Sequence, residues 1–222
     1  MNRSQARENM IEQQIRPWDV LDQRVLDVLG EIPREQFVDE QYHGVAYSDH
    51  RMPIGHGQEM LHPNFDARMI QALALQNTDS VLEIGTGSGY TATCLSRLSR
   101  SVETVEISTP LADAARARFA EMACSNISSH NLDASEIWDA ADEYDAIAFT
   151  GSVQTIPEYY KLKMAIGGRL FVVVGDIDAP TMTAILLTRL AEQEWTTDSL
   201  FETCIPPLEN FSAPASSDDF VF

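Results

Sequence analysis

The chain has 222 residues, 44% of them hydrophobic and 22% charged, which suits one α/β domain with a sizeable core and argues against disorder. Fifteen Lys and Arg against 34 Asp and Glu give a formal net charge of −19; such a field repels phosphate backbones, so neither nucleic acid nor an anionic membrane is expected as a partner. No apolar run reaches the roughly 18 residues of a membrane span. The polar N-terminus and three scattered cysteines predict a reducing, cytoplasmic location.

Helical patterns dominate an N-terminal unit, which we assign to residues 1–79. The first apolar stripe ends where Pro17 breaks it, and a second follows Asp19 or Asp22, either of which suits a helix cap. The two stripes comprise Met10, Ile11 and Ile15, then Leu21, Val25, Leu26 and Leu29. Residues 43–63 are rich in Gly, Pro and His and are expected to form a loop. Asn64 is expected to cap a further helix.

From residue 80 to residue 222 the chain alternates between strand and helix patterns and is expected to form one compact domain with the N-terminal unit. Predicted strands cover residues 80–85, 101–107, 126–133, 144–150, 167–176, 183–190 and 199–208. Predicted helices cover residues 89–98, 111–122 and 156–166, and the tail 209–222 is a loop expected to dock through its apolar end. This alternation predicts an α/β fold with a doubly wound, mostly parallel sheet.

A glycine-rich loop follows the first predicted strand in the stretch "VLEIGTGSG". Gly85, Gly87 and Gly89 are spaced G-x-G-x-G, which is neither the dinucleotide fingerprint G-x-G-x-x-G nor a Walker loop. The acid Glu83 just before the loop would repel a pyrophosphate and attract a cation. The loop therefore favours a cationic ligand without a phosphate, although a lone glycine loop is often only a tight turn.

Two further acids end the next predicted strands. Glu106 is placed to bind a ribose diol, and Asp133 is placed to accept from an adenine amino group. Each could alone be a helix cap or a solvated acid. Three acids at the tips of neighbouring strands, where open α/β sheets bind ligands, favour a nucleoside site.

The loop and these acids resemble the class I S-adenosylmethionine-dependent methyltransferases, whose fold is Rossmann-like. The resemblance implies S-adenosyl-L-methionine as the cofactor. It places the cofactor on Glu83, Gly85, Gly87, Gly89, Glu106 and Asp133, with Thr86, Ser88, Ile107 and Ala134 lining the same site.

The preceding segment resembles the protein-L-isoaspartate O-methyltransferases. The resemblance extends from about residue 10 to residue 208 and includes the C-terminal "IPPL". Matching features are Arg34, Phe37-Val38, Ala46-Tyr47 with Asp49, Pro53-Ile54-Gly55, Gly57-Gln58 and Pro63. It implies an enzyme that methylates the free carboxylate of isoaspartyl residues in damaged proteins, a repair reaction on a protein or peptide substrate. It also implies acceptor-side roles for Asp49, Gln58 and residue 61.

The chain departs from this family's pattern directly after Gly57-Gln58. The family reads Thr-Ile-Ser there and the chain reads Glu59-Met60-Leu61, so Leu61 occupies the position of the family's serine. Glu59 adds a negative charge near the expected acceptor. An alternative is therefore an S-adenosylmethionine-binding protein with another acceptor or without catalysis.

Other polar residues leave further alternatives open. A cationic cluster that could receive a carboxylate comprises His43, His50, His56 and His62 with Arg51 and Arg68. The histidine spacing fits no zinc pattern, so no metal site is expected. After the strand at 144–150, Ser152 either contacts the acceptor or, more in keeping with its surroundings, belongs to a turn.

Overall fold

The computed structural model describes residues 2–138, 140–141 and 143–211. Its helices, with short 3-10 and π segments labelled η, are α1 (Arg3–Met10), η1 (Ile11–Ile15), η2 (Arg16–Trp18), α2 (Gln23–Glu31), η3 (Arg34–Phe37), η4 (Glu40–Tyr42), α3 (Pro63–Leu73), α4 (Tyr90–Leu98), α5 (Thr109–Glu121) and α6 (Glu158–Leu162). Its strands are β1 (Met52–Gly55), β2 (Gln58–Met60), β3 (Ser80–Ile84), β4 (Ser101–Glu106), β5 (Ile127–Asn131), β6 (Tyr144–Val153), β7 (Met164–Val174), β8 (Met182–Ala191) and β9 (Glu194–Thr203).

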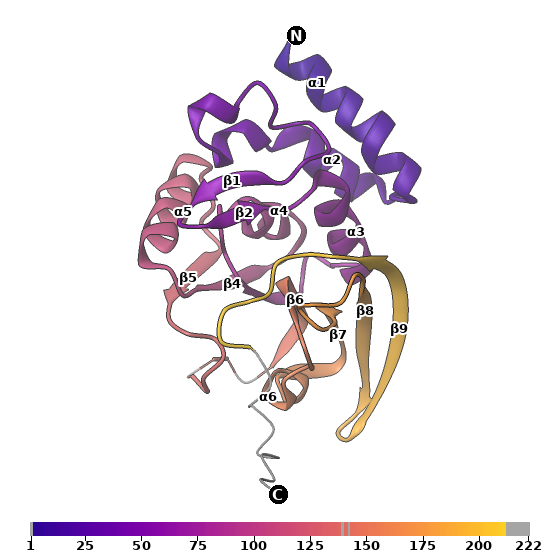
Figure 1. Ribbon diagram of the computed structural model, residues 1–222. Coiled ribbons are helices and arrows are strands. Elements are labelled where there is room, and N and C mark those ends of the chain that lie inside the picture. Colours follow the sequence, from indigo (N-terminus) through magenta and orange to yellow (C-terminus); the bar gives the residue numbers. More distant parts are fainter. Residues whose placement is uncertain (1, 139, 142, 212–222) are drawn as a thin grey trace, which may run out of the picture.

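Seven of the described strands form one sheet in the order β5-β4-β3-β6-β7-β8-β9 (Figure 1). The first five are parallel, and β8 and β9 add an antiparallel hairpin at one edge. The order reverses between β3 and β6, as in doubly wound sheets, which bind ligands at such a point. The predicted fold class is confirmed.

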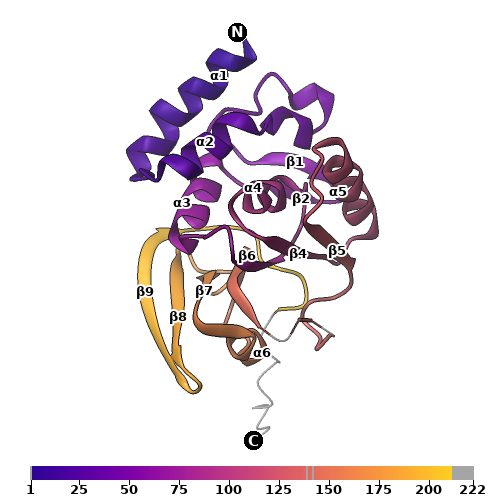
Figure 2. The ribbon, with the colours of Figure 1, turned by 180° about the vertical axis from the view of Figure 1, so that it is seen from behind.

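Side chains alternate between the two faces of the sheet, because successive residues of a strand point to opposite sides. Val81, Val102 and Phe171 pack against α3, α4 and α5, while Leu82 and Leu170 pack against α6 and the segment before β6. Buried residues of α1 and α2 join the first of these clusters. Seen from either side, α1, α2 and the β1–β2 hairpin form a cap beyond α4 (Figures 1 and 2). No described helix is both long enough and apolar enough to cross a membrane.

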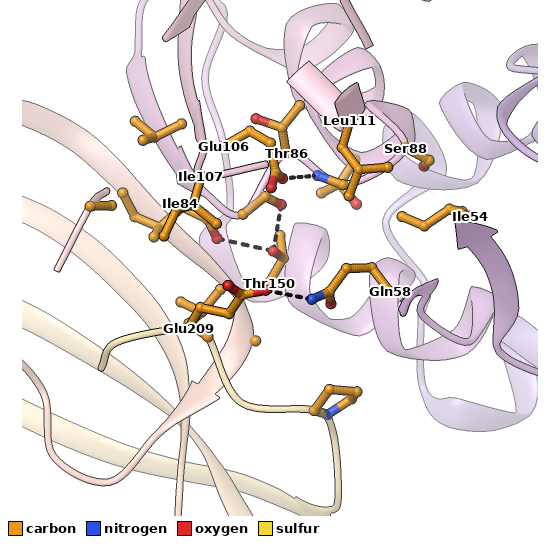
Figure 3. Close-up of a pocket in the computed structure, with 18 of the residues that line it drawn as sticks. Ile54, Gln58, Ile84, Thr86, Ser88, Glu106, Ile107, Leu111, Thr150 and Glu209 are labelled. Carbon is orange, nitrogen blue, oxygen red and sulfur yellow. Dashed lines mark hydrogen bonds between the residues drawn. The ribbon is translucent and has the colours of Figure 1, made fainter. Parts of the chain in front are cut away.

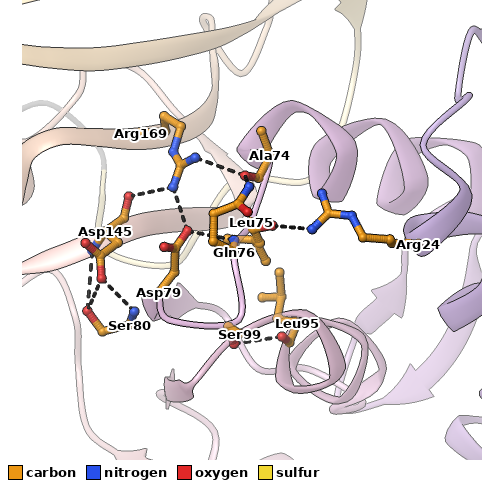
Figure 4. Close-up of polar contacts among 10 residues, drawn as sticks. All are labelled: Arg24, Ala74, Leu75, Gln76, Asp79, Ser80, Leu95, Ser99, Asp145 and Arg169. Atoms are coloured by element: carbon orange, nitrogen blue, oxygen red, sulfur yellow. Dashed lines mark hydrogen bonds and ion pairs between the residues drawn. The ribbon is translucent and has the colours of Figure 1, made fainter.

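Polar contacts join the amino ends of the central strands, opposite the ligand-binding edge (Figure 4). Arg169 at β7 donates to Asp79 Oδ2 at 2.7 Å and to the Ala74 carbonyl at 3.0 Å. Asp145 of β6 accepts from the Ser80 backbone N–H at 2.8 Å. These bonds fix the stagger of β3, β6 and β7 and thereby the positions of their carboxyl ends.

In the N-terminal unit, the break near Pro17 and the cap at Asp22 are confirmed, and three other expectations are corrected. Asp22 caps α2, whereas Leu21 lies before the helix and is 69% exposed. Residues 43–63 contain the β1–β2 hairpin, which turns through Gly55, His56 and Gly57, all with positive φ. Strands of three and four residues with a proline give too short a pattern to predict. The cap position of α3 is His62, and Asn64 is buried inside the first turn.

Three corrections also apply to the core. The predicted helix 156–166 is shorter, because α6 ends at Leu162 and β7 begins at Met164, with Gly167-Gly168 forming an irregularity inside that strand. The last strand lies earlier than predicted, at Glu194–Thr203. Ser152 belongs to β6 and not to a turn. Residues 212–222 of the tail lie outside the described residues.

Candidate functional site

A pocket opens at the carboxyl ends of β3, β4 and β6, between the β1–β2 hairpin and the segment that follows β9 (Figure 3). The pocket is lined by Ile54, Gln58, Glu59, Met60, Leu61, Asp66, Ile84, Gly85, Thr86, Gly87, Ser88, Thr91, Val105, Glu106, Ile107, Leu111, Leu132, Asp133, Ala134, Thr150, Gly151, Pro206, Pro207, Leu208, Glu209 and Phe211. Most of the predicted site residues are therefore brought together. The exceptions are Asp49, Glu83 and Gly89.

The glycine loop turns sharply from β3 into α4. Gly85, Gly87 and Gly89 all have positive φ, a conformation that side chains disfavour. A Cβ at Gly85 would collide with the Thr150 hydroxyl, and one at Gly89 would lie 2.8 Å from a ring carbon of Phe119. Gly85 thus lets the loop lie against β6, and Gly89 lets the start of α4 pack on α5. Gly89 itself is absent from the pocket lining, and its close contact with Phe119 is a packing contact.

Glu106, the last residue of β4, holds the loop in place. Its carboxylate accepts from the backbone N–H of Gly87 at 2.8 Å (Figure 3). It also accepts from the backbone N–H of Ser108 at 2.9 Å. The side chain is buried yet lines the pocket. A carboxylate oxygen accepts more than one hydrogen bond, so Glu106 can also receive a ligand hydroxyl.

Glu83 lies behind the pocket wall. It is fully buried and accepts from the Thr104 hydroxyl at 2.5 Å, and Thr104 in turn lies 2.6 Å from the hydroxyl of Thr86, which lines the pocket. Burial raises the pKa of Glu83 to about 8, despite the hydrogen bond from Thr104 that lowers it. Its Oε1 has no hydrogen-bond partner among the described residues. Glu83 therefore does not line the pocket, and hydrogen bonds through Thr104 and Thr86 link it to the lining.

Asp133 follows β5 and lines the pocket beside Ala134. Its Oδ1 accepts from the Ser135 N–H at 2.9 Å, and its Oδ2 accepts from the Asn210 amide at 2.6 Å. Partial burial opposes ionisation, but these hydrogen bonds keep the pKa of Asp133 below its ordinary value. Asp133 is therefore an ionised acceptor at the tip of β5.

The hairpin and the following turn form the opposite wall. Leu61 is 7% exposed and lines the pocket, and its carbonyl accepts from the buried guanidinium of Arg34. Gln58 also lines the pocket and donates to Glu209 Oε1 at 2.9 Å. Asp49 lies outside the lining and is 3.1 Å from His62 Nδ1.

The predicted cationic cluster is not gathered at this wall. Arg51 forms an ion pair with Glu59 at 3.4 Å, which offsets the extra negative charge of the hairpin. Arg68 donates to the Trp18 carbonyl at 2.8 Å and lies over the Phe201 ring. Within the described ranges, no three His, Cys, Asp or Glu side chains are arranged to hold a metal ion.

Sequence reasoning missed several residues of this site. Thr150 at β6 donates to the Gly85 carbonyl at 2.6 Å, and Arg34 pairs at 2.7 Å with Asp66, which lines the pocket. The segment after β9 contributes Leu208, Glu209 and Phe211. Of these residues, only Thr150 had a local signal, because it ends the predicted strand 144–150 and parallel strand ends meet at one edge of the sheet. The other contacts join distant parts of the chain.

The residues present fit a sulfonium nucleoside. Gly85 and Gly87 form a cradle without side chains beside Thr86. The free Oε1 of Glu83 lies behind that cradle, where a positive ligand would favour its ionised form. Glu106 and Asp133 supply acceptors suited to hydroxyl and amino groups. Among the residues that the structure describes, the lining contains no Lys or Arg for a phosphate.

Comparison with known proteins agrees with this geometry. Residues 4–207 match the family model for protein-L-isoaspartate(D-aspartate) O-methyltransferase. A protein-L-isoaspartate O-methyltransferase of Rhodopseudomonas palustris is 40% identical over 199 residues, which are 90% of this chain and 91% of that protein. One of Brucella anthropi is 36% identical, over 93% and 94% of the two chains.

Two solved structures share the fold. One named protein-L-isoaspartate O-methyltransferase superposes with a TM-score of 0.80 at 22% identity, covering 95% of this chain and 67% of that one. Another, described as a Plasmodium falciparum protein-L-isoaspartate O-methyltransferase in complex with S-adenosyl-L-homocysteine, gives a TM-score of 0.77 at 19% identity, covering 94% and 99%.

Proposed function

The chain belongs to the protein-L-isoaspartate(D-aspartate) O-methyltransferase family, and we propose that the pocket described above holds both its cofactor and its acceptor. The protein is an S-adenosylmethionine-dependent methyltransferase of isoaspartyl residues. The observation that carries the assignment of the pocket is the meeting of the glycine loop, Glu106 and Asp133 with the β1–β2 hairpin around one cavity.

Bound S-adenosylmethionine supplies an electrophilic methyl group on a positively charged sulfur. In the proposal, Glu106 receives the ribose hydroxyls and Asp133 receives the adenine amino group. The backbone of Gly85–Gly87 faces the amino-acid part of the cofactor, with Ser88, Ile107 and Ala134 completing the walls. Glu83 contributes through Thr104 and Thr86, by favouring positive charge in the cradle.

The acceptor is proposed to be a carboxylate on a protein or peptide. One of its oxygens forms a bond to the methyl carbon while the carbon–sulfur bond breaks and the sulfur keeps the electron pair. A carboxyl group with a pKa near 4 is already ionised at pH 7, so no general base is needed. Positioning and exclusion of water then supply most of the rate. The absence of a serine at Leu61 therefore removes an orienting hydroxyl and leaves the chemistry intact.

A paired-peptide assay tests this proposal. Labelled S-adenosylmethionine is offered with an isoaspartyl peptide and, separately, with its aspartyl twin. We expect labelling of the isoaspartyl peptide well above that of the twin. Equal, background-level labelling of both would contradict the repair function. No finding favours the alternative of a protein that binds the cofactor without catalysis.

The cofactor assignment predicts the effect of Glu106→Ala. Loss of a charged acceptor for two hydroxyls should weaken S-adenosylhomocysteine binding by about 1–3 kcal/mol, measured by calorimetry. Glu103→Ala on the same strand, whose side chain bonds Tyr144 instead of lining the pocket, is the matched control. An unchanged dissociation constant for Glu106→Ala would show that the residue is misassigned.

Two broader proposals follow from the chain as a whole. Residues 1–79 are proposed to form a cap over the acceptor side of the core, which comprises residues 80–222. Buried residues of α1 and α2 share one hydrophobic cluster with the sheet, which supports placing cap and core in one compact domain. A cytoplasmic location is proposed because Cys94, Cys124 and Cys204 are all free thiols.

A further inference from the structure

The segment after β9 is held firmly along the pocket rim. Pro207 forms a parallel bridge with Ser152, whose N–H donates to the Pro206 carbonyl and whose carbonyl accepts from the Leu208 N–H, both at 2.9 Å. Leu208 packs so closely on Gly151 that a Cβ there would lie 2.9 Å from it. The backbone leading to Glu209 is therefore fixed by β6.

Glu209 projects from this anchored backbone to the acceptor side of the pocket. Its carboxylate accepts from the Gln58 amide at 2.9 Å, a contact between residues 151 positions apart in the chain (Figure 3). Both side chains line the pocket together with Leu61. Asn210, the next residue, donates to Asp133. The rim segment thus spans both ends of the pocket.

The two acids of the acceptor wall differ in their partners. Glu59 forms an ion pair with Arg51 at 3.4 Å. Glu209 makes no ion pair with any basic side chain of the described residues, and its hydrogen-bond partner is the neutral amide of Gln58. Glu209 therefore brings an uncompensated negative charge to the place where an acceptor carboxylate must bind.

We propose that Glu209 is a specificity-determining residue of the acceptor site, whose carboxylate competes with the acceptor carboxylate for the Gln58 amide. This rests on the proposed acceptor side of the pocket. A negatively charged acceptor must displace Glu209 from Gln58 and also approach a like charge. Methylation turns the acceptor into a neutral ester, a weaker hydrogen-bond acceptor than a carboxylate. The Glu209 carboxylate then accepts again from the Gln58 amide in place of the ester, which favours release of the methylated product.

The experiment compares wild type with Glu209→Gln, which keeps the shape and removes the charge. We expect the KM for an isoaspartyl peptide to fall about three- to tenfold, since one competing charge-assisted bond and one repulsion are lost. The Kd of S-adenosylhomocysteine should stay within twofold, because the change acts on the acceptor. Glu202→Gln on β9, an exposed acid outside the pocket, is the matched control and should change neither value.

The outcomes separate the two proposals. An isoaspartyl KM that is unchanged or raised in Glu209→Gln, with an active wild type, overturns the role of Glu209 alone. A fall in KM that Glu202→Gln reproduces overturns it too, because net charge would then be the cause. Wild type that labels isoaspartyl and aspartyl peptides equally overturns both the function and this inference.

Discussion

In the proposed acceptor site, the backbone of Leu61 is held independently of its side chain. It is buried in the pocket wall, and its backbone carbonyl is held by Arg34, so the peptide position does not depend on the side chain. The identity of residue 61 therefore decides which side chain faces the pocket, while Arg34 holds the backbone at that position.

Leu61→Ser should raise kcat/KM for an isoaspartyl peptide by about ten- to a hundredfold, the effect of one hydrogen bond to a charged group. It should also lower the free energy of unfolding by about 2–5 kcal/mol, as expected for the loss of a buried leucine. Leu61→Ala is the control, since it removes the same bulk without adding a hydroxyl. Equal activity of the Ser and Ala variants would show that residue 61 does not orient the acceptor.

Glu83 is the residue whose burial has the clearest consequence for pH dependence. Its pKa is raised from 4.5 to about 8, mainly by burial and further by the nearby charges of Asp66 and Glu106. Between these values the folded state holds a proton that the unfolded state has lost. The contribution of Glu83 to stability is thus complete below pH 4.5 and is lost as the pH rises through about 8.

Glu83→Gln should remove this dependence, because the amide stays neutral. The free energy of unfolding of the variant minus that of wild type should increase from pH 5 to pH 8.5, measured by urea denaturation at several pH values. The same measurement on Glu202→Gln is the control, because that variant also loses one negative charge but at an exposed position. A difference that is flat with pH would mean that Glu83 is ionised throughout in the folded protein.

At the scale of elements, the buried pair Arg34–Asp66 joins η3 to α3. The atoms Arg34 Nη1 and Asp66 Oδ2 are 2.7 Å apart, and the guanidinium carbon lies 4.7 Å from the centre of the Tyr90 ring at the start of α4. The three elements η3, α3 and α4 therefore meet at one guanidinium. No pattern in the sequence indicates that Arg34, Asp66 and Tyr90 are in contact, because the three residues come from separate elements.

Asp66→Ala should lower the free energy of unfolding by about 3–5 kcal/mol, because it leaves the Arg34 charge buried without its partner. Glu12→Ala is the control: its pair with Arg16 is similarly short, at 2.9 Å, but exposed, so the cost should be about 0–1 kcal/mol. Urea denaturation measures both. Similar small losses for the two variants would show that Asp66 is neutral in the fold.

At the scale of the whole molecule, the net charge of −19 is the dominant feature. Like charges on one surface destabilise the compact state by repulsion, and salt screens them. Raising sodium chloride from about 0.05 M to 0.5 M should therefore raise Tm by about 2–4 °C, which corresponds to about 1 kcal/mol. Glucose at equal osmolality is the control. A Tm that falls with salt would show that attractive ion pairs outweigh the repulsion.

The sequence by itself determined the sheet and the proposed cofactor end of the pocket. Glu106 ends β4 and Asp133 follows β5, and parallel strands bring such ends together without further information. The spacing of Gly85, Gly87 and Gly89 and the position of Glu83 before them are also local features. The order of residues alone is therefore enough to predict a ligand-binding loop there.

Only the tertiary structure decided how the pocket is closed. In the folded chain Glu83 lies behind Thr104 and Thr86, and Asp49 lies outside the pocket lining. Glu209 contacts Gln58, which is 151 positions away in the chain. No periodicity or motif encodes such contacts, because they depend on how β6 anchors the segment after β9 and on where the hairpin lies. The proposed acceptor side is formed by packing between distant segments, whereas the proposed cofactor side is formed by neighbouring strand ends.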